Sequence, residues 1–150
     1  MNAARLAVAV VLAGALAACA RPASSAKAFG SSTPVAAVGE DPASSSDGAR
    51  VYITNCSSCH QLDGRGVPGA FPPLAGNPTA TGDPARAIAI VKGGSRGKIR
   101  VRGRSYDGVM PAWQGLISDE DIAAVVTYIR GAWNNGAPPV SAAGVKAIRP

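Results

Sequence analysis

The sequence predicts an all-α domain of fewer than about 100 residues, and two observations support this prediction. Six of the seven aromatic residues lie between Tyr52 and Trp133, which confines the foldable part to about residues 48–135 of the 150. Three segments carry helix-capping signals: one runs from Ser46 or Asp47 to the cysteines at 56 and 59, one from Asp83 to the glycine pair 93–94, and one starts at Ser118. Hydrophobic residues make up 47% of the chain, an ordinary share for a globular protein, so the composition excludes wholesale disorder.

Each expected helix has its own start signal. The capping residues are Ser46 or Asp47, Asp83, and Ser118. Pro84 follows Asp83 at the first helical position, and the glycine pair 93–94 ends that helix. The third helix has apolar residues spaced three and four apart, which predicts one buried face formed by Ile122, Val125, Val126, Ile129 and Trp133. A core built from three such helices is marginal unless a further group stabilises it.

The N-terminus has the features of an export signal. Arg5 precedes Leu6–Ala20, a run of 15 uncharged residues, whereas a helix that crosses a bilayer needs about 20. A basic start followed by a short apolar run is typical of a secretory signal peptide, which we expect over residues 1–18. A buried N-terminal helix is the alternative interpretation.

The expected signal ends in Leu16-Ala17-Ala18-Cys19, which resembles the lipobox of bacterial lipoproteins. This resemblance implies that Cys19 becomes the first residue of the mature protein and carries the lipid. The chain has three cysteines, and if the other two act as a pair, Cys19 is an odd thiol that needs an explanation. Plain secretory cleavage that leaves a stray thiol is the alternative. Residues 19–47 are rich in Ala, Ser, Pro and Gly and are expected to form a flexible tether behind the lipidated cysteine.

Cys56-Ser57-Ser58-Cys59-His60 is a C-x-x-C-H motif, the attachment signature of c-type haem. Residues three apart lie on the same side of a helical turn, so both thiols can reach one edge of a porphyrin and form thioethers with its vinyl groups. His60, the only histidine of the chain, would then supply the proximal nitrogen to the iron. A zinc site would need a fourth ligand, and a thioredoxin-like disulfide would need a βαβ setting; neither is visible.

Met110 is the candidate for the second axial ligand of the iron. It is the only methionine besides the initiator, and glycine and proline residues around it predict a loop rather than a helix. A His/Met pair fills both axial positions of the iron and raises its reduction potential. Ordinary packing of Met110 in the core is the alternative.

Several strings within residues 48–135 resemble a small class I cytochrome c. They are Gly48-Ala49-Arg50-Val51-Tyr52 before the haem motif, Gly69-Ala70-Phe71-Pro72-Pro73-Leu74-Ala75-Gly76-Asn77, Tyr106-Asp107-Gly108-Val109-Met110-Pro111, and Tyr128-Ile129-Arg130. The resemblance implies the class I fold, in which three or more helices surround one covalently attached haem c. It also implies that the Pro72 carbonyl, or less favourably that of Pro73, accepts a hydrogen bond from His60, and that Leu74 packs on the porphyrin. Gly48 would permit a close approach of the first and last helices near Tyr128.

The second and third strings resemble more closely the cytochrome domains and subunits that accompany bacterial quinoprotein dehydrogenases or copper enzymes. This implies redox-protein partners, among them such a dehydrogenase, a copper enzyme or a terminal oxidase. The expected function is that of a monohaem single-electron carrier, periplasmic and lipid-anchored to the membrane, either as a shuttle or as the electron-transfer subunit of an oxidoreductase. It is not expected to be an enzyme alone. The alternative is a haem-based peroxidase or gas sensor with a displaceable methionine.

The formal net charge is +6, and positive residues gather just before the expected methionine loop. The members of this group are Lys92, Arg96, Lys98, Arg100, Arg102 and Arg104. They predict either a docking patch for an acidic partner or a solvated face with one or two members paired with haem propionates. The alternation over residues 98–104 indicates a short strand or hairpin. Nucleic acid is not an expected partner, because the chain has an export signal and no binding-fold signature. The sequence leaves open whether the tail, residues 136–150, wraps the domain.

Overall fold

The structure is a computed structural model, and it describes residues 45–150 of the chain. The expected signal peptide, the expected lipid attachment site at Cys19 and the expected tether up to residue 44 lie outside the described residues. Within the described part, no helix is long and apolar enough to cross a membrane.

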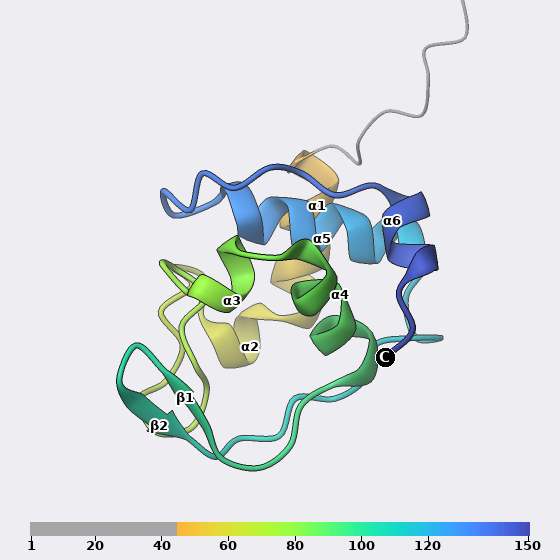
Figure 1. Cartoon of the computed structure of the whole chain (residues 1–150). Coiled ribbons are helices and arrows are strands. Elements are labelled where there is room, and N and C mark those ends of the chain that lie inside the picture. The colour runs from red at the N-terminus through yellow and green to blue at the C-terminus, as the bar shows by residue number, and fades with distance from the viewer. Residues whose placement is uncertain (1–44) are drawn as a thin grey trace, which may run out of the picture. The chain divides into compact units, whose positions relative to one another are not determined.

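The described chain is mostly helical, which confirms the predicted fold class. It contains helices α1 (Ser45–Asn55), α2 (Ser57–His60), α3 (Pro78–Thr81), α4 (Pro84–Gly93), α5 (Asp119–Gly131) and α6 (Ala142–Ala147), with strands β1 (Ile99–Val101) and β2 (Arg104–Tyr106) between α4 and α5. Figure 1 shows α1, α5 and α6 gathered at the top of the molecule, with the β1–β2 hairpin at the lower left. Long loops connect these two regions.

Two of the predicted helix starts are confirmed. The Asp83 side chain accepts a hydrogen bond of 2.9 Å from the backbone N–H of Ala85, and Ser118 Oγ accepts one of 3.0 Å from that of Asp121. These bonds satisfy backbone donors that the first turn of a helix leaves without partners.

The first helix differs from the prediction at its start, whereas it runs to the cysteines of the haem motif as predicted. It begins at Ser45, so neither Ser46 nor Asp47 is its cap, and Asp47 instead lies in its first turn, where a negative charge suits the helix dipole. It ends at Asn55 and is followed by α2, so that Cys56 lies at the joint between the two helices. The third predicted helix stops early, since α5 ends at Gly131 and Trp133 has a positive φ of 53°.

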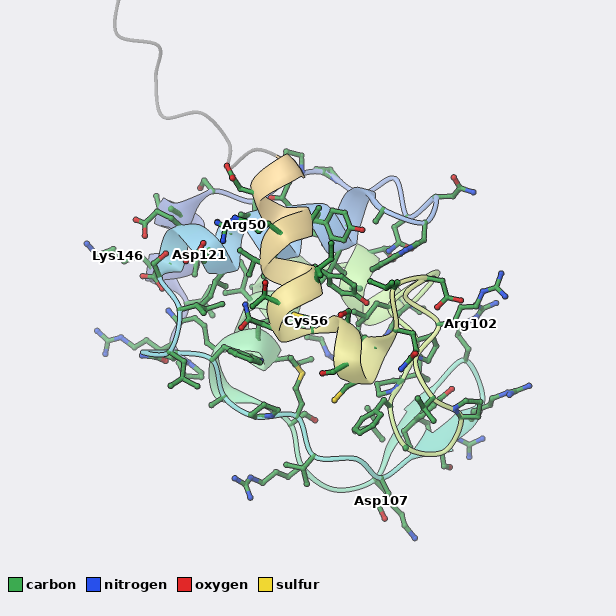
Figure 2. The ribbon with its side chains drawn as sticks, turned by 180° about the vertical axis from the view of Figure 1, so that it is seen from behind. Arg50, Cys56, Arg102, Asp107, Asp121 and Lys146 are labelled. Atoms are coloured by element: carbon green, nitrogen blue, oxygen red, sulfur yellow. The ribbon has the colours of Figure 1, made fainter. Side chains whose placement is uncertain are left out.

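Helices α1 and α5 pack directly against each other, and Figure 2 shows from behind how one crosses the other. A Cβ atom added to Gly48 would collide with the carbonyl oxygen of Ala124 and would lie 2.7 Å from Tyr128 Cβ, so only glycine fits at this crossing. The rings of Tyr52, Tyr128 and Trp133 pack against each other beside it, with centroids 5.2–5.6 Å apart. These contacts fix α1, and hence the haem motif that follows it, against the C-terminal helix.

Strands β1 and β2 form an antiparallel hairpin in which Ile99 pairs with Tyr106 and Val101 with Arg104. The turn residues Arg102 and Gly103 have positive φ angles of 49° and 80°, as a two-residue hairpin turn requires. Val101 and Tyr106 are buried on the inner side, and the arginines between them are exposed. The alternating segment is therefore a hairpin rather than a single strand.

The C-terminal segment 132–150 packs along the domain. Val140 and Val145 are buried, and Thr127 Oγ1 both donates to the Val140 carbonyl (3.2 Å) and accepts from the Val140 N–H (3.0 Å). The buried Lys92 ammonium donates to the carbonyl oxygens of Val145 (2.9 Å) and Ile148 (2.7 Å). We refer to residues 132–150 as the C-terminal strap.

Because Gly48 sits at the crossing, we expect Gly48→Ala to destabilise the haem-loaded protein by about 1–3 kcal/mol despite the better helix propensity of alanine. Denaturant unfolding followed by circular dichroism measures this change. Gly131→Ala is the matched control. Gly131 is the last residue of helix α5, and a Cβ atom added there meets nothing within 4 Å. Equal stability of the two variants would contradict the close-packed crossing.

Candidate haem site

One large cavity, of about 640 Å³, lies between α2, the loop that follows it, α4, the β1–β2 hairpin and α5. Its volume falls within the usual range of about 300–1,000 Å³ for ligand and cofactor pockets. Its lining is mainly apolar, with Leu74, Ile90, Val126 and Ile129 among its walls. A cavity of this kind in a small core marks the place of a large apolar group.

The three residues of the C-x-x-C-H motif line this cavity. Helix α2 is a single turn, in which the backbone N–H groups of Cys59 and His60 both donate to the Cys56 carbonyl, at 3.2 and 2.9 Å. The two cysteines form no disulfide, and both are half-buried. Cys56 lies where α1 ends, as labelled in Figure 2, so α1 sets its position and the turn of α2 sets that of Cys59.

Burial also changes the chemistry of these groups. It raises the pKa of the Cys56 thiol to about 11, with a smaller contribution from the nearby Cys59. Burial likewise raises the pKa of the Tyr52 phenol, whose hydroxyl donates a hydrogen bond of 2.6 Å to the Gln61 carbonyl. Tyr52 thereby ties α1 to the loop that leaves the haem motif.

The His60 ring is held in one orientation. Its Nδ1 atom lies 3.0 Å from the carbonyl oxygen of Pro72, the proline that the resemblance favoured over Pro73. Burial lowers the pKa of His60, and the bond to Pro72 opposes this effect without reversing its direction. The imidazole is therefore neutral at pH 7, and with Nδ1–H donating to Pro72, the Nε2 atom keeps a lone pair for a metal.

The loop between α2 and α3 brings Pro72 and Leu74 to the cavity wall. The Gly64 carbonyl accepts from the N–H groups of Leu74 (2.7 Å) and Ala75 (3.0 Å), which closes the loop on itself. Gly66 has a positive φ of 65°, and a Cβ there would collide with the backbone of Phe71, so this turn requires glycine. Both Pro72 and Leu74 line the cavity.

Met110 lines the same cavity from the loop that follows the hairpin. Its backbone forms two hydrogen bonds with Ser95, from Ser95 N–H to the Met110 carbonyl (3.0 Å) and from Met110 N–H to the Ser95 carbonyl (2.9 Å). Gly94 has a positive φ of 76°, and a Cβ there would lie 2.5 Å from the Met110 carbonyl oxygen. The end of α4 therefore fixes the methionine loop.

The sequence indicated Gly93-Gly94 only as a helix stop, and it gave no indication that Ser95 supports Met110. The pairing joins residues 15 apart in the chain across an isolated bridge, for which no local pattern exists. Arg130 was also missed as a cavity residue; it was noted only as part of a family string, although it lines the cavity and is 3% exposed.

The predicted group of basic residues divides into two. Five members are exposed on the hairpin or just before it, and we refer to them as the basic hairpin surface: Arg96, Lys98, Arg100, Arg102 and Arg104. Lys92 was wrongly included, since it is 4% exposed, holds the C-terminal strap and lies 3.7 Å from an Asp119 carboxylate oxygen. It lies on the inner face of α4, which a sequence count of charges does not distinguish from the outer face.

The residues present fit a covalently bound haem. Two thiols, a neutral imidazole and a thioether sulfur line one apolar cavity, whereas no group of three or more His, Cys, Asp or Glu residues in positions 45–150 could hold a metal ion by itself. This set of side chains suits an iron that is already bound in a porphyrin, and it does not suit a zinc site.

Comparison with known proteins agrees with this geometry. The family model for cytochrome c matches residues 45–133. Cytochrome c-552 of Thermus thermophilus is 41% identical over 112 residues, which cover 69% of this chain and 84% of that protein. The cytochrome c subunit of the quinone alcohol dehydrogenase of Gluconobacter oxydans is 41% identical over 105 residues, 68% of this chain but only 22% of that subunit.

A similar partial match covers 24% of the gluconate 2-dehydrogenase cytochrome c subunit of Pantoea cypripedii, at 37% identity. The chain therefore corresponds to most of c-552 and to one part of each dehydrogenase subunit. The cavity, the C-x-x-C-H turn and these matches lead to one conclusion: the chain belongs to the cytochrome c family, is an electron-transfer protein, and carries haem c bound covalently through Cys56 and Cys59.

Proposed function

We propose that this cytochrome c is a single-electron carrier whose haem iron is ligated by His60 and Met110. The observation that carries the proposal is the position of Met110, which lines the haem cavity on a loop held by two backbone hydrogen bonds to Ser95. An iron with both axial positions filled exchanges electrons without binding a substrate.

The side chains around the cavity suit this task. Pro72 fixes the His60 ring and increases the basicity of its free nitrogen, which strengthens ligation. The thioether of Met110 is a softer ligand that favours the reduced iron and raises the potential. The apolar wall excludes water, so few solvent dipoles must reorient when the charge of the iron changes. When bound, the haem supplies the one-electron iron couple.

The alternative, a haem peroxidase or gas sensor, needs a free or easily freed axial position. Carbon monoxide binds the reduced iron only at such a position, so it distinguishes the two functions. We expect the reduced wild-type protein not to bind carbon monoxide, and Met110→Ala to bind it readily. The absorption spectrum under carbon monoxide measures both.

Asp107→Asn is the matched control, because Asp107 precedes Met110 in the same loop, is exposed and is not among the residues that line the cavity. It should behave as the wild type does. Ready binding of carbon monoxide to the wild-type protein would favour the sensor or peroxidase and overturn the carrier.

We further propose that the basic hairpin surface is the docking site for an acidic redox partner. Ile99, Arg100 and Val101 of strand β1 line the haem cavity, so this charged surface lies beside the haem. The relatives named as dehydrogenase subunits favour a quinoprotein-type dehydrogenase as partner, while a copper enzyme or a terminal oxidase would also be chemically suited. Positive charge near the point where the electron leaves the haem raises the association rate with an acidic partner at low salt.

Reversing this charge should slow electron transfer and reduce its salt dependence. We expect Arg102→Glu/Arg104→Glu to lower the rate at which host membranes oxidise the reduced protein about tenfold or more at low ionic strength. Lys146→Glu/Arg149→Glu makes the same change of charge on the C-terminal strap, at exposed residues, and should have little effect. Equal effects of the two double variants would exclude docking through the hairpin.

We also propose that the protein is exported and anchored through lipid on Cys19 at the outer face of a bacterial membrane. The support is the lipobox-like sequence and the odd number of cysteines, since Cys56 and Cys59 are taken by haem. The Ala/Ser/Pro-rich segment before α1 would then connect the domain to the membrane.

Cys19→Ser removes the acceptor for the lipid while leaving the haem motif intact. We expect the variant to keep its haem and to move from the membrane fraction to the soluble periplasmic fraction, as haem staining after fractionation would show. A variant that stays with the membrane would contradict lipid anchoring.

The proposed carrier has two versions: a shuttle that moves between redox proteins, and a permanent subunit of an oxidoreductase complex. A native gel of membranes solubilised in mild detergent, stained for haem, separates them. Migration near the mass of the monomer supports the shuttle, and migration within a larger assembly supports the subunit.

A further inference from the structure

We propose that Arg130 is the buried counter-charge of one haem propionate, and that it links the haem to the C-terminal strap. The proposal requires only haem c in the cavity and is independent of the axial ligation, docking and anchoring proposed above. It assigns a role to a residue that those functions leave unexplained.

The charge of the cavity wall is unbalanced. Its charged lining residues are all arginines, namely Arg86, Arg100 and Arg130, and no aspartate, glutamate or lysine lines it. The other titratable groups that face the cavity are His60 and the two cysteines that bind haem. Haem c brings two propionate carboxylates into this cavity, so the cofactor supplies the negative charge that the wall lacks.

The three arginines differ in burial. Arg86 and Arg100 are exposed, so water solvates their charge, whereas Arg130 is 3% exposed. A buried guanidinium is costly unless it is paired and hydrogen-bonded. No acidic residue in the described part forms an ion pair with Arg130. Asp83, next to one of the segments that Arg130 contacts, is exposed and caps α4.

Backbone carbonyls hold the guanidinium in place. Nε donates to Pro138 (2.7 Å), and Nη1 donates to Ala80 (2.9 Å) and Gly82 (3.0 Å). These bonds join α5 to the C-terminal strap on one side and to the end of α3 on the other. They also use all the donors of Nε and Nη1, so the guanidinium cannot rotate freely.

Only Nη2 has no acceptor among residues 45–150. No fully enclosed side-chain nitrogen in that part of the chain lacks a partner, so Nη2 retains accessible surface, and Arg130 is one of the residues that line the cavity. A fixed guanidinium in the wall of a cavity, with two N–H donors left over, is suited to a carboxylate. Neutral carbonyls orient the charge without cancelling it.

A propionate paired with Arg130 should stay ionised at unusually low pH, because a buried positive charge favours its charged form. Carbon-13 NMR of haem labelled at its carboxyl carbons, through labelled 5-aminolevulinate, measures the pKa of each propionate separately. In the wild-type protein we expect one pKa well below about 4.3, the value of an ordinary glutamate side chain.

We expect Arg130→Gln to lower the acid dissociation constant of that one propionate tenfold or more and to lower the reduction potential of the haem. Arg130→Lys keeps the positive charge and should show smaller changes in both. Arg86→Gln removes an exposed cavity arginine and should leave that propionate unchanged. Thr127→Val loosens the C-terminal strap at Val140 without touching the guanidinium, and it should also leave that propionate unchanged.

Two results would overturn the proposal. If Thr127→Val reproduces the effect of Arg130→Gln, Arg130 acts only by holding the strap. If both propionates of the wild-type protein titrate as ordinary carboxyls, no buried counter-charge exists. The second result needs no variant, so it stands even if Arg130→Gln fails to fold.

Discussion

The burial of haem in a cavity that the polypeptide cannot fill by itself is the constraint on which this structure depends. The cavity of about 640 Å³ is lined by residues from α2, α4, β1 and α5, so these elements meet each other largely across it. Direct packing of the helices is concentrated at the crossing of α1 and α5 and at the contact of α5 with α6, and a core of so few residues is marginal without a further group. Covalent attachment through Cys56 and Cys59 keeps the group that completes the core from dissociating, and it places that group beside His60.

The surroundings of the haem follow from the same constraint. The Pro72 carbonyl orients the His60 ring, and the end of α4 fixes the Met110 loop through Ser95. Lys92 and Arg130, both buried, use their charged ends to bind backbone carbonyls of the C-terminal strap. The strap is thus held by charged groups of α4 and α5, while one exposed cation of the hairpin, Arg100, lines the cavity itself.

The parts that depend on local chemistry were predictable from the sequence. The C-x-x-C-H spacing predicted the cofactor, and the capping residues Asp83 and Ser118 predicted two helix starts. Each of these signals acts between residues that are close together in the sequence. The inner and outer faces of α4 were not separable in this way, so Lys92 was assigned to the wrong surface. Ser95 and Arg130 could not be foreseen, since their partners lie far along the chain and only the folded structure brings them together.

The central claim is that the haem completes the fold, and the most direct measurement is far-ultraviolet circular dichroism of a haem-free Cys56→Ala/Cys59→Ala variant. With its cavity unfilled, this variant should lose most of its helical signal and unfold without a cooperative transition. The haem-loaded protein should show the helical content of the structure and a sharp transition. Native-like helicity with cooperative unfolding in the haem-free variant would contradict the account, because the helices would then form a stable core without the cofactor.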